Sequence, residues 1–294
     1  MAAVEIEIRP MQARDVAIAQ QLSDDAFFEL DTRSYPRDWP SPERRTPAHV
    51  ASWEKRTQHF LEHDAGGCWV AEDASGVVGF ATSFIRERAW CLATYAVRPD
   101  LQGGGVGRRL LDAAEAYGAR CPIALLSASI DARAVRRYWR SGFELHPQMF
   151  LRGRVDGGRA PAVVGVRDGR AADVELMDAI ARDLRGGGHG PDHAVLAEMA
   201  RPLVAETATG RGFAYTDGAR LAVLAATDEA TARTLLWACL AGAERDYVVP
   251  HVTGANQWAI DIGLTAGLTL AQSGYLGLRG MAPPSPYVHN GALL

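Results

Sequence analysis

The most informative segment of this chain is Val97-Arg98-Pro99-Asp100-Leu101-Gln102-Gly103-Gly104-Gly105-Val106-Gly107-Arg108-Arg109-Leu110. The apolar residues 90–97 predict a strand before the glycines, and apolar side chains at helical spacing over residues 106–117 predict a helix after them. Glycines allow several backbone N–H groups to converge on one point, and the first-turn amides of the helix point the same way. The segment therefore predicts an anion site, most naturally a phosphate site.

Two other phosphate-binding loops are excluded by the same residues. A P-loop needs Gly-Lys-Ser/Thr, whereas Gly107 is followed by Arg108 and Arg109. The dinucleotide fingerprint needs a third glycine where Arg108 stands and an acidic residue after the next strand, which ends in Leu-Ser-Ala-Ser. Arginines in a first helical turn oppose the helix dipole, so their placement favours a bound anion. The alternative is a tight turn that binds nothing.

A second pattern follows one strand later, as Asp131-x-x-Ala134-x3-Tyr138-x3-Gly142-Phe143. Together with Gln102-x-x-Gly105-x-Gly107, it resembles the two motifs of the GNAT family of N-acetyltransferases. Asp131 departs from the family, which usually has asparagine there. The resemblance covers residues 5–155 and implies an α+β fold, with a mixed, mostly antiparallel sheet flanked by helices.

The resemblance implies that the protein transfers an acetyl group from acetyl-CoA to the amine of a small molecule or peptide. The transfer would be direct, in a ternary complex, and would need no metal. The pantetheine arm would pair with a strand edge through main-chain groups, at Tyr95, Ala96 and Val97. Further cofactor-binding residues implied by the resemblance are Gln102, Gly103, Gly104, Gly105, Val106, Gly107, Arg108 and Asp131.

Two tyrosines are the catalytic candidates. The backbone N–H of Tyr95 would stabilise the developing carbonyl oxyanion, and the phenol of Tyr138, still protonated at neutral pH, would protonate the leaving sulfur. Both roles are implied by the resemblance. For an unplaced tyrosine, packing in the core would be the better interpretation.

The acceptor side is less defined. Residues 31–40, rich in proline and aromatics, are expected to form a loop, and by resemblance Tyr35 and Trp39 would contact the substrate. The general base stays open among Glu29, Asp31, Asp38 and His146, a water relay, or direct binding of the neutral amine.

Residues 47–63 are expected to form a second helix. A glycine-rich stretch, residues 153–161, predicts a boundary between domains 1–155 and 162–294, and the first strand beyond it is expected at residues 163–166. Beyond it, Asn256-x-x-Ala259-x3-Gly263-x3-Gly267-Leu268 repeats the spacing of the second motif, which suggests duplication. Residues 225–233, the counterpart of the glycine loop, contain no glycine and two carboxylates, and Gly263 replaces Tyr138. We therefore expect a degenerate GNAT-like half that binds no acetyl-CoA and is structural or shapes the substrate site.

Composition limits the remaining possibilities. Net charge is −4 over 294 residues with no long run of one sign, so neither nucleic acid nor a membrane is indicated as a partner. Four scattered cysteines predict free thiols and a cytoplasmic protein. We expect a monomer or a homodimer. His189, Asp192 and His193 lie in a glycine-rich segment that we interpret as a mobile loop rather than a metal site.

Two alternatives stay open. A non-catalytic binder or sensor of acyl-CoA would keep the glycine loop, although it would not need Tyr138. A transferase with another acyl donor is the second alternative; the phosphate loop and the acidic net charge disfavour aminoacyl-tRNA as that donor.

Overall fold

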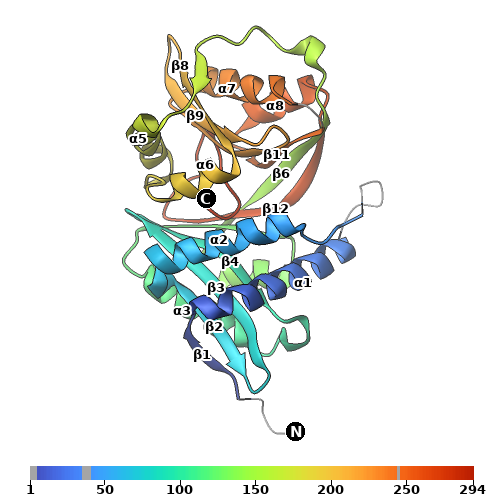
Figure 1. Ribbon diagram of the computed structural model, residues 1–294, viewed down its shortest axis with the longest axis vertical. Helices are drawn as coiled ribbons and strands as arrows, with labels where there is room; N and C mark the ends of the chain where they lie inside the picture. The colour runs from blue at the N-terminus through green and yellow to red at the C-terminus, as the bar shows by residue number, and fades with distance from the viewer. Residues whose placement is uncertain (1–4, 35–40, 244–245) are drawn as a thin grey trace. The chain divides into compact units, whose positions relative to one another are not determined.

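The computed structural model describes residues 5–34, 41–243 and 246–294. The chain folds into two compact units. The first unit comprises Met1–Ile85 and Trp90–Cys121, and the second comprises Arg86–Ala89 and Pro122–Leu294. Each unit is described by itself, with the element labels of Figure 1.

The first unit contributes neighbouring strands in the order β1-β2-β3-β4, and its described residues include the helices α1, α2 and α3. The β2–β3 hairpin turns at residues 74–75 and pairs antiparallel from Cys68 with Thr82 to Asp73 with Gly76. Its strands are β1 (Glu7–Pro10), β2 (Cys68–Asp73), β3 (Gly76–Arg86) and β4 (Ala89–Val97). Its helices are α1 (Val16–Ser34), α2 (Pro47–His63) and α3 (Val106–Tyr117).

Aromatic side chains hold α2 on this sheet. Phe60 stacks on Phe84 with ring centroids 5.1 Å apart, and Trp53 meets Phe80 edge to face at 5.7 Å. On α3, Leu110, Leu111 and Ala114 are fully buried, as the helical spacing of the apolar residues predicts. The sheet and its helices thereby fix the strand-to-helix junction between β4 and α3.

The second unit contains two sets of neighbouring strands, β5-β12-β6-β11 and β13-β10-β9-β8-β7. β12, which comes late in the chain, pairs antiparallel with both β5 and β6. The strands of the first set are β5 (Ile123–Ala128), β6 (Glu144–Arg154), β11 (Asp246–Thr253) and β12 (Thr269–Arg279). Those of the second set are β7 (Val166–Asp168), β8 (Arg201–Glu206), β9 (Arg211–Thr216), β10 (Leu221–Ala226) and β13 (Tyr287–Val288). The helices are α4 (Ala132–Arg140), α5 (Val174–Arg185), α6 (Asp192–Met199), α7 (Glu229–Ala241) and α8 (Gln257–Thr265).

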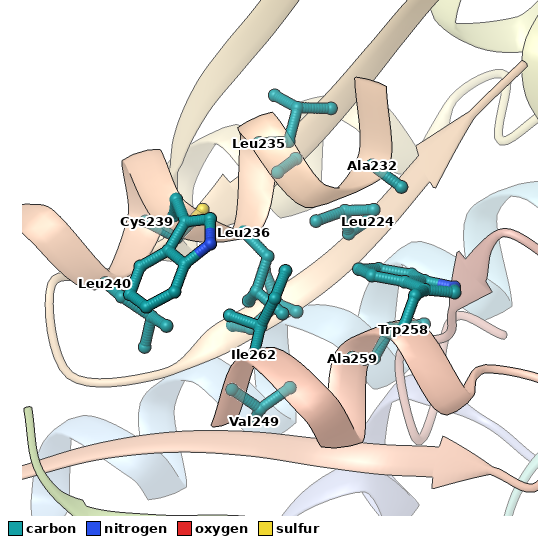
Figure 2. Close-up of a cluster of buried hydrophobic side chains, with 14 of the residues drawn as sticks. Leu224, Ala232, Leu235, Leu236, Cys239, Leu240, Val249, Trp258, Ala259 and Ile262 are labelled. Carbon is teal, nitrogen blue, oxygen red and sulfur yellow. The ribbon is translucent and has the colours of Figure 1, made fainter. Parts of the chain in front are cut away.

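One continuous apolar core joins α7 and α8 to the strands of the second unit. Figure 2 shows Leu235 and Leu236 of α7 and Ile262 of α8 among the side chains of this cluster. Leu224 of β10 and Val249 of β11, each fully buried, belong to the same cluster. Burial of this size supplies most of the driving force for folding the unit.

The predicted fold class is confirmed: helices flank mixed, mostly antiparallel sheets. Three local expectations were wrong. Helix α1 continues to Ser34, through the first residues of the expected loop, and the strand expected at 163–166 begins only at Val166. Strand β8 was not expected at all. Among the described residues, no helix is both long and apolar enough to cross a membrane.

Candidate active site

The glycine loop of the first unit lies at the junction of β4 and α3. After β4, Pro99–Leu101 form one turn of 3-10 helix, and Gly105 is the N-cap residue of α3. Gly103 and Gly105 have φ angles of +92° and +88°, which favour glycine. No atom lies within 4 Å of where a Cβ would stand at either position. The loop is therefore open on the side that these two glycines face.

The backbone amides of this loop are available as donors. Residues 103–105 are exposed. Within the described residues, the amides of residues 103–107 donate to no protein acceptor, whereas those of Arg108 and Arg109 donate to Gly105 O at 3.1 and 3.2 Å. No side chain caps α3. A cluster of unpaired N–H groups at a helix N-terminus attracts an anion, and this cradle fits a pyrophosphate.

The two arginines after the loop differ in their surroundings. The guanidinium of Arg109 donates to Ile6 O at 2.8 Å, which ties α3 to the N-terminal side of β1. The side chain of Arg108 is 77% exposed, and its Nε lies 4.0 Å from Asp112 Oδ2. Such an exposed ion pair is weak, so the positive charge of Arg108 can interact with a phosphate.

Strand β4 is tied to the loop by Gln102. The side-chain Nε2 of Gln102 donates to Val97 O at 2.9 Å, and the N–H of Arg98 donates to Val78 O at 2.8 Å. Ala96 and Val97 are buried, and Tyr95 is half-buried. The structure thus gives Gln102 a contact within the protein that the sequence did not predict.

The second motif is placed on α4 of the second unit. Asp131 is the N-cap of α4, where its Oδ1 accepts from the N–H groups of Arg133 and Ala134 at 2.9 and 3.1 Å. Burial opposes ionisation, but these bonds and the Arg133 guanidinium outweigh it and lower the pKa of Asp131. Tyr138 is 6% exposed, and its ring meets Phe143 edge to face at 6.4 Å.

The sequence matches the Acetyltransferase (GNAT) family over residues 25–143, which include both motifs. Residues 25–143 are thus similar to the GNAT family. A comparison with curated proteins finds no match. The family match thus covers both motifs and also residues 25–101, which precede the glycine loop.

Solved structures extend the fold likeness to the whole chain. A Pyrococcus horikoshii protein described as a candidate acetyltransferase is 18% identical with a TM-score of 0.73, over all of this chain and 96% of that chain. A GCN5-related N-acetyltransferase from Kribbella flavida is 16% identical with a TM-score of 0.56, over 94% of this chain and 72% of that chain. A tandem GNAT protein from the clavulanic acid biosynthesis pathway is 13% identical with a TM-score of 0.54, over 95% of this chain and 99% of that chain. At these identities the likeness concerns the fold, which is that of tandem GNAT proteins.

On the acceptor side of the GNAT domain, the candidate residues are only partly described. Tyr35, Trp39 and Asp38 all lie in residues 35–40, outside the described residues. Glu29 Oε1 lies 3.5 Å from Arg33 Nη1 in an exposed i,i+4 pair on α1, and Asp31 is exposed on the same helix. On β6 of the second unit, His146 Nε2 lies 3.7 Å from Glu144 Oε2.

A group of donors on α2 was missed by the sequence reasoning. The indole Nε1 of Trp53 and the Nε of Arg56 are buried and have no hydrogen-bond acceptor in the described part of the chain. Arg45 and Arg56 lie beside the Trp53 ring, with Cζ 5.8 and 6.0 Å from its centroid. Burial, with a contribution from Arg45, lowers the pKa of Arg56 to about 10. Donors without acceptors on the same helix are suited to a carboxylate or phosphate group.

The histidines and Asp192 of segment 186–193 have partners within the protein. Nε of Arg86 donates to Asp192 Oδ2 at 2.9 Å, and both side chains are buried. The ring of His193 lies 2.9 Å from Tyr215 Oη through Nδ1 and 3.0 Å from Asp178 Oδ1 through Nε2. In the described residues, no group of three or more such side chains could hold a metal ion. The expectation of a mobile loop was wrong, because residues 187–189 are buried and packed against the protein.

Proposed function

We propose that this protein is an acetyl-CoA-dependent N-acetyltransferase that acts on the amine of a small molecule or peptide by direct transfer in a ternary complex. The observation that carries the proposal is the open glycine loop of the GNAT domain, where the amides of residues 103–107 have no acceptor within the described residues. These amides lie at the N-terminus of α3, so the helix dipole adds to their attraction for a diphosphate.

Acetyl-CoA would be held by main-chain groups. The amides of residues 103–107, with the charge of Arg108, would hold the pyrophosphate, and the main chain of Tyr95, Ala96 and Val97 would pair with the pantetheine arm. Gln102 fixes the end of β4 relative to the loop, through its bond to Val97 O. The coenzyme supplies an activated acetyl thioester.

The neutral amine nitrogen would attack the thioester carbonyl, so that a C–N bond forms as the C–S bond breaks, and the nitrogen would lose a proton to water or to a general base. The chain's own groups would stabilise the charge on the carbonyl oxygen and protonate the leaving sulfur. The N–H of Tyr95 would donate to the carbonyl oxygen as negative charge develops there. The Oη of Tyr138 would give its proton to the sulfur, because a phenol with a pKa near ~10 is protonated at neutral pH whereas a thiol has a pKa near ~8.5. Substrate positioning would contribute the rest of the acceleration.

We assign this chemistry to domain 1–155 and a structural or substrate-shaping role to domain 162–294, and we place the protein in the cytoplasm as a monomer or homodimer. The four cysteines are thiols rather than disulfides, and three of them are buried. Burial raises the pKa of Cys68 and of Cys239 to about 12 in each case, so both are present as unreactive thiols. Thiols of this kind are typical of a reducing compartment.

Replacement of Tyr138 by phenylalanine tests the proposal. We expect Tyr138→Phe to keep acetyl-CoA affinity by calorimetry and to lose about 100-fold or more in turnover with a panel of amines, because it lacks only the acid. Tyr117→Phe is the matched control; it removes a bond to Asp64 Oδ1 and should keep turnover. Wild-type protein that binds acetyl-CoA but acetylates no amine would instead indicate a non-catalytic binder. Full turnover of Tyr138→Phe would remove the phenol from the mechanism.

A further inference from the structure

In the second unit, the chain's own late segment, residues 284–290, packs against two strands, β10 and β11; the strip that it covers beside these strands is termed the groove. β10 and β11 belong to different sheets, and a parallel bridge joins Arg220, the residue before β10, to Val248 of β11, where Val248 N donates to Ala219 O at 2.8 Å. β13 contacts both strands. It pairs antiparallel with β10, so that Tyr287 lies opposite Ala225. The segment therefore occupies an edge of β10 that would otherwise present unpaired main-chain groups.

Bonds on either side of β13 lengthen this pairing. Ala226 N donates to Pro286 O at 3.3 Å, and Asn290 Nδ2 donates to Ala222 O at 3.2 Å. Tyr287 and Val288 are 2% and 0% exposed. The segment is thus bound along the whole edge of β10 in the manner of an added strand.

Asn256, the N-cap residue of α8, holds the segment through its side chain. Its Nδ2 donates to Pro284 O at 3.1 Å, and its Oδ1 accepts from Tyr287 N at 3.0 Å. The side chain is fully buried. Asn256 is also the first residue of the repeated motif, the counterpart of Asp131 in the GNAT domain. A position equivalent to a predicted coenzyme contact therefore binds the main chain of residues 284–287.

The other wall of the groove holds the segment through stacked rings. His289 stacks on His251 of β11, with ring centroids 4.8 Å apart and planes 25° apart. His251 Nδ1 lies 3.1 Å from Gln148 Oε1 of β6. His251 has a φ of +56°, a conformation that costs energy for a residue other than glycine and that the surroundings must maintain. Both walls of the groove are therefore shaped around residues 287–289.

We propose that residues 284–290 are the built-in occupant of a ligand groove that the second half retains from duplication, in place of a pantetheine-like chain. Naming pantetheine as the competing ligand rests on the proposed function, in which the equivalent edge, at Tyr95 to Val97, pairs with that arm. The segment offers what such an arm offers: an extended chain whose amide groups bond to an open strand edge and to the side chain at the start of the following helix. The absence of glycine from residues 225–233 removes the phosphate site, and the segment closes the remaining groove.

Hydrogen exchange of the full chain tests this occupancy. Asn256→Ala removes both bonds to the segment, and Val288→Gly removes a buried side chain without touching Asn256. We expect exchange of the amides of Leu224 and Ala226, which point toward β13, to become about tenfold faster or more in each variant, because the covering strand opens more often. Ser285→Ala is the matched control, since the hydroxyl that it removes makes an exposed bond to Ala255 O. It should leave these amides at the wild-type rate.

Added pantetheine identifies the ligand class. We expect millimolar pantetheine to slow exchange of the amides of Leu224 and Ala226 in both variants and to leave it unchanged in the wild type, where the groove is full. Wild-type exchange rates in both variants would overturn the occupancy, and failure of pantetheine to protect either variant would overturn the ligand class. Acetyl-CoA turnover is measured in parallel, so that loss of the proposed function appears in the wild-type assay and not in the exchange rates.

Discussion

Two strand-to-helix junctions of this chain, β4 to α3 and β10 to α7, share an element order but differ in what occupies the helix N-terminus. At α3 the N-cap is Gly105, and no side chain bonds to the first-turn amides. At α7 the N-cap is Asp228, whose carboxylate accepts from the N–H and the hydroxyl of Thr231 at 2.9 and 2.8 Å. One N-terminus is left for an outside anion, whereas the other is satisfied by an anion of the protein itself.

The strand edges beside these junctions extend the contrast. The edge of β10 is covered by residues 284–290, and Asn256 bonds to that segment. Asp131, the counterpart of Asn256, bonds to its own helix through Arg133 and Ala134. On our proposal, residues 284–290 supply to the edge of β10 the kind of main-chain bonds that a pantetheine arm would supply to β4.

The largest expected effect comes from placing a carboxylate at the N-cap of α3, as Asp228 does at the N-cap of α7. Gly105→Asp places a carboxylate beside the amides of residues 103–107. Asparagine and aspartate tolerate the positive φ, and the Cβ meets open space, so the fold should persist. We expect about 100-fold or greater loss of acetyl-CoA affinity by calorimetry, since like charges in contact cost several kcal/mol.

Gly105→Asn is the control, because it has the same shape without the charge. It should lose much less affinity than Gly105→Asp. Equal losses of acetyl-CoA affinity in the two variants would mean that the added charge has no effect, so that the phosphate does not lie beside residue 105 and both variants act only by changing the backbone of the loop.

Local patterns of the sequence predicted most of the elements that make this contrast. Helix α2 was predicted over its full length, residues 47–63, because its apolar spacing and Pro47 are local properties. Helix α1 was cut short in the prediction because the loop was assigned from composition, although its first proline, Pro36, comes only after Ser34. Helical propensity thus continued to the point where proline forbids it.

Long-range pairing was beyond the sequence. Nothing near residues 269–279 indicates that this strand pairs with β5 and β6, and the proline-rich composition of the last residues indicates an extended chain but not its partner, β10. The glycines of 186–193 misled the reasoning for a related reason. A Cβ at Gly187 would overlap the backbone of Arg86, so this glycine permits close packing rather than motion.

A smaller effect is expected from acid, which should act on the second unit. Burial lowers the pKa of His189 well below its usual value, and that of His289 to about 4. Because the folded pKa lies below the unfolded value of ~6.5, the unfolded chain binds the proton first as the pH falls. The stability that the neutral rings contribute is fully present above pH ~6.5. Below that pH, each ring lowers the free energy of unfolding by about 1.4 kcal/mol per pH unit.

Urea unfolding at pH 7 and pH 5, with hydrogen exchange to locate the change, measures this loss. We expect the amides of β10 and β13 to lose protection at pH 5. His289→Phe keeps an aromatic ring on His251 but cannot titrate, so its stability should depend less on pH. An unchanged pH dependence in that variant would show that His289 takes no part.

The smallest expected effect comes from opening the second junction. Asp228→Ala removes the cap of α7, which should lower the free energy of unfolding by about 1 kcal/mol, because the first-turn amides lose their acceptor. Asp228→Asn keeps an acceptor oxygen and should retain most of that stability, which thermal unfolding of the two variants compares. Neither variant should bind a second acetyl-CoA by calorimetry, since residues 284–290 still cover the edge of β10. A second binding event in Asp228→Asn would mean that the carboxylate alone excluded the coenzyme, and that the segment is a support for β10 rather than a replacement for a ligand.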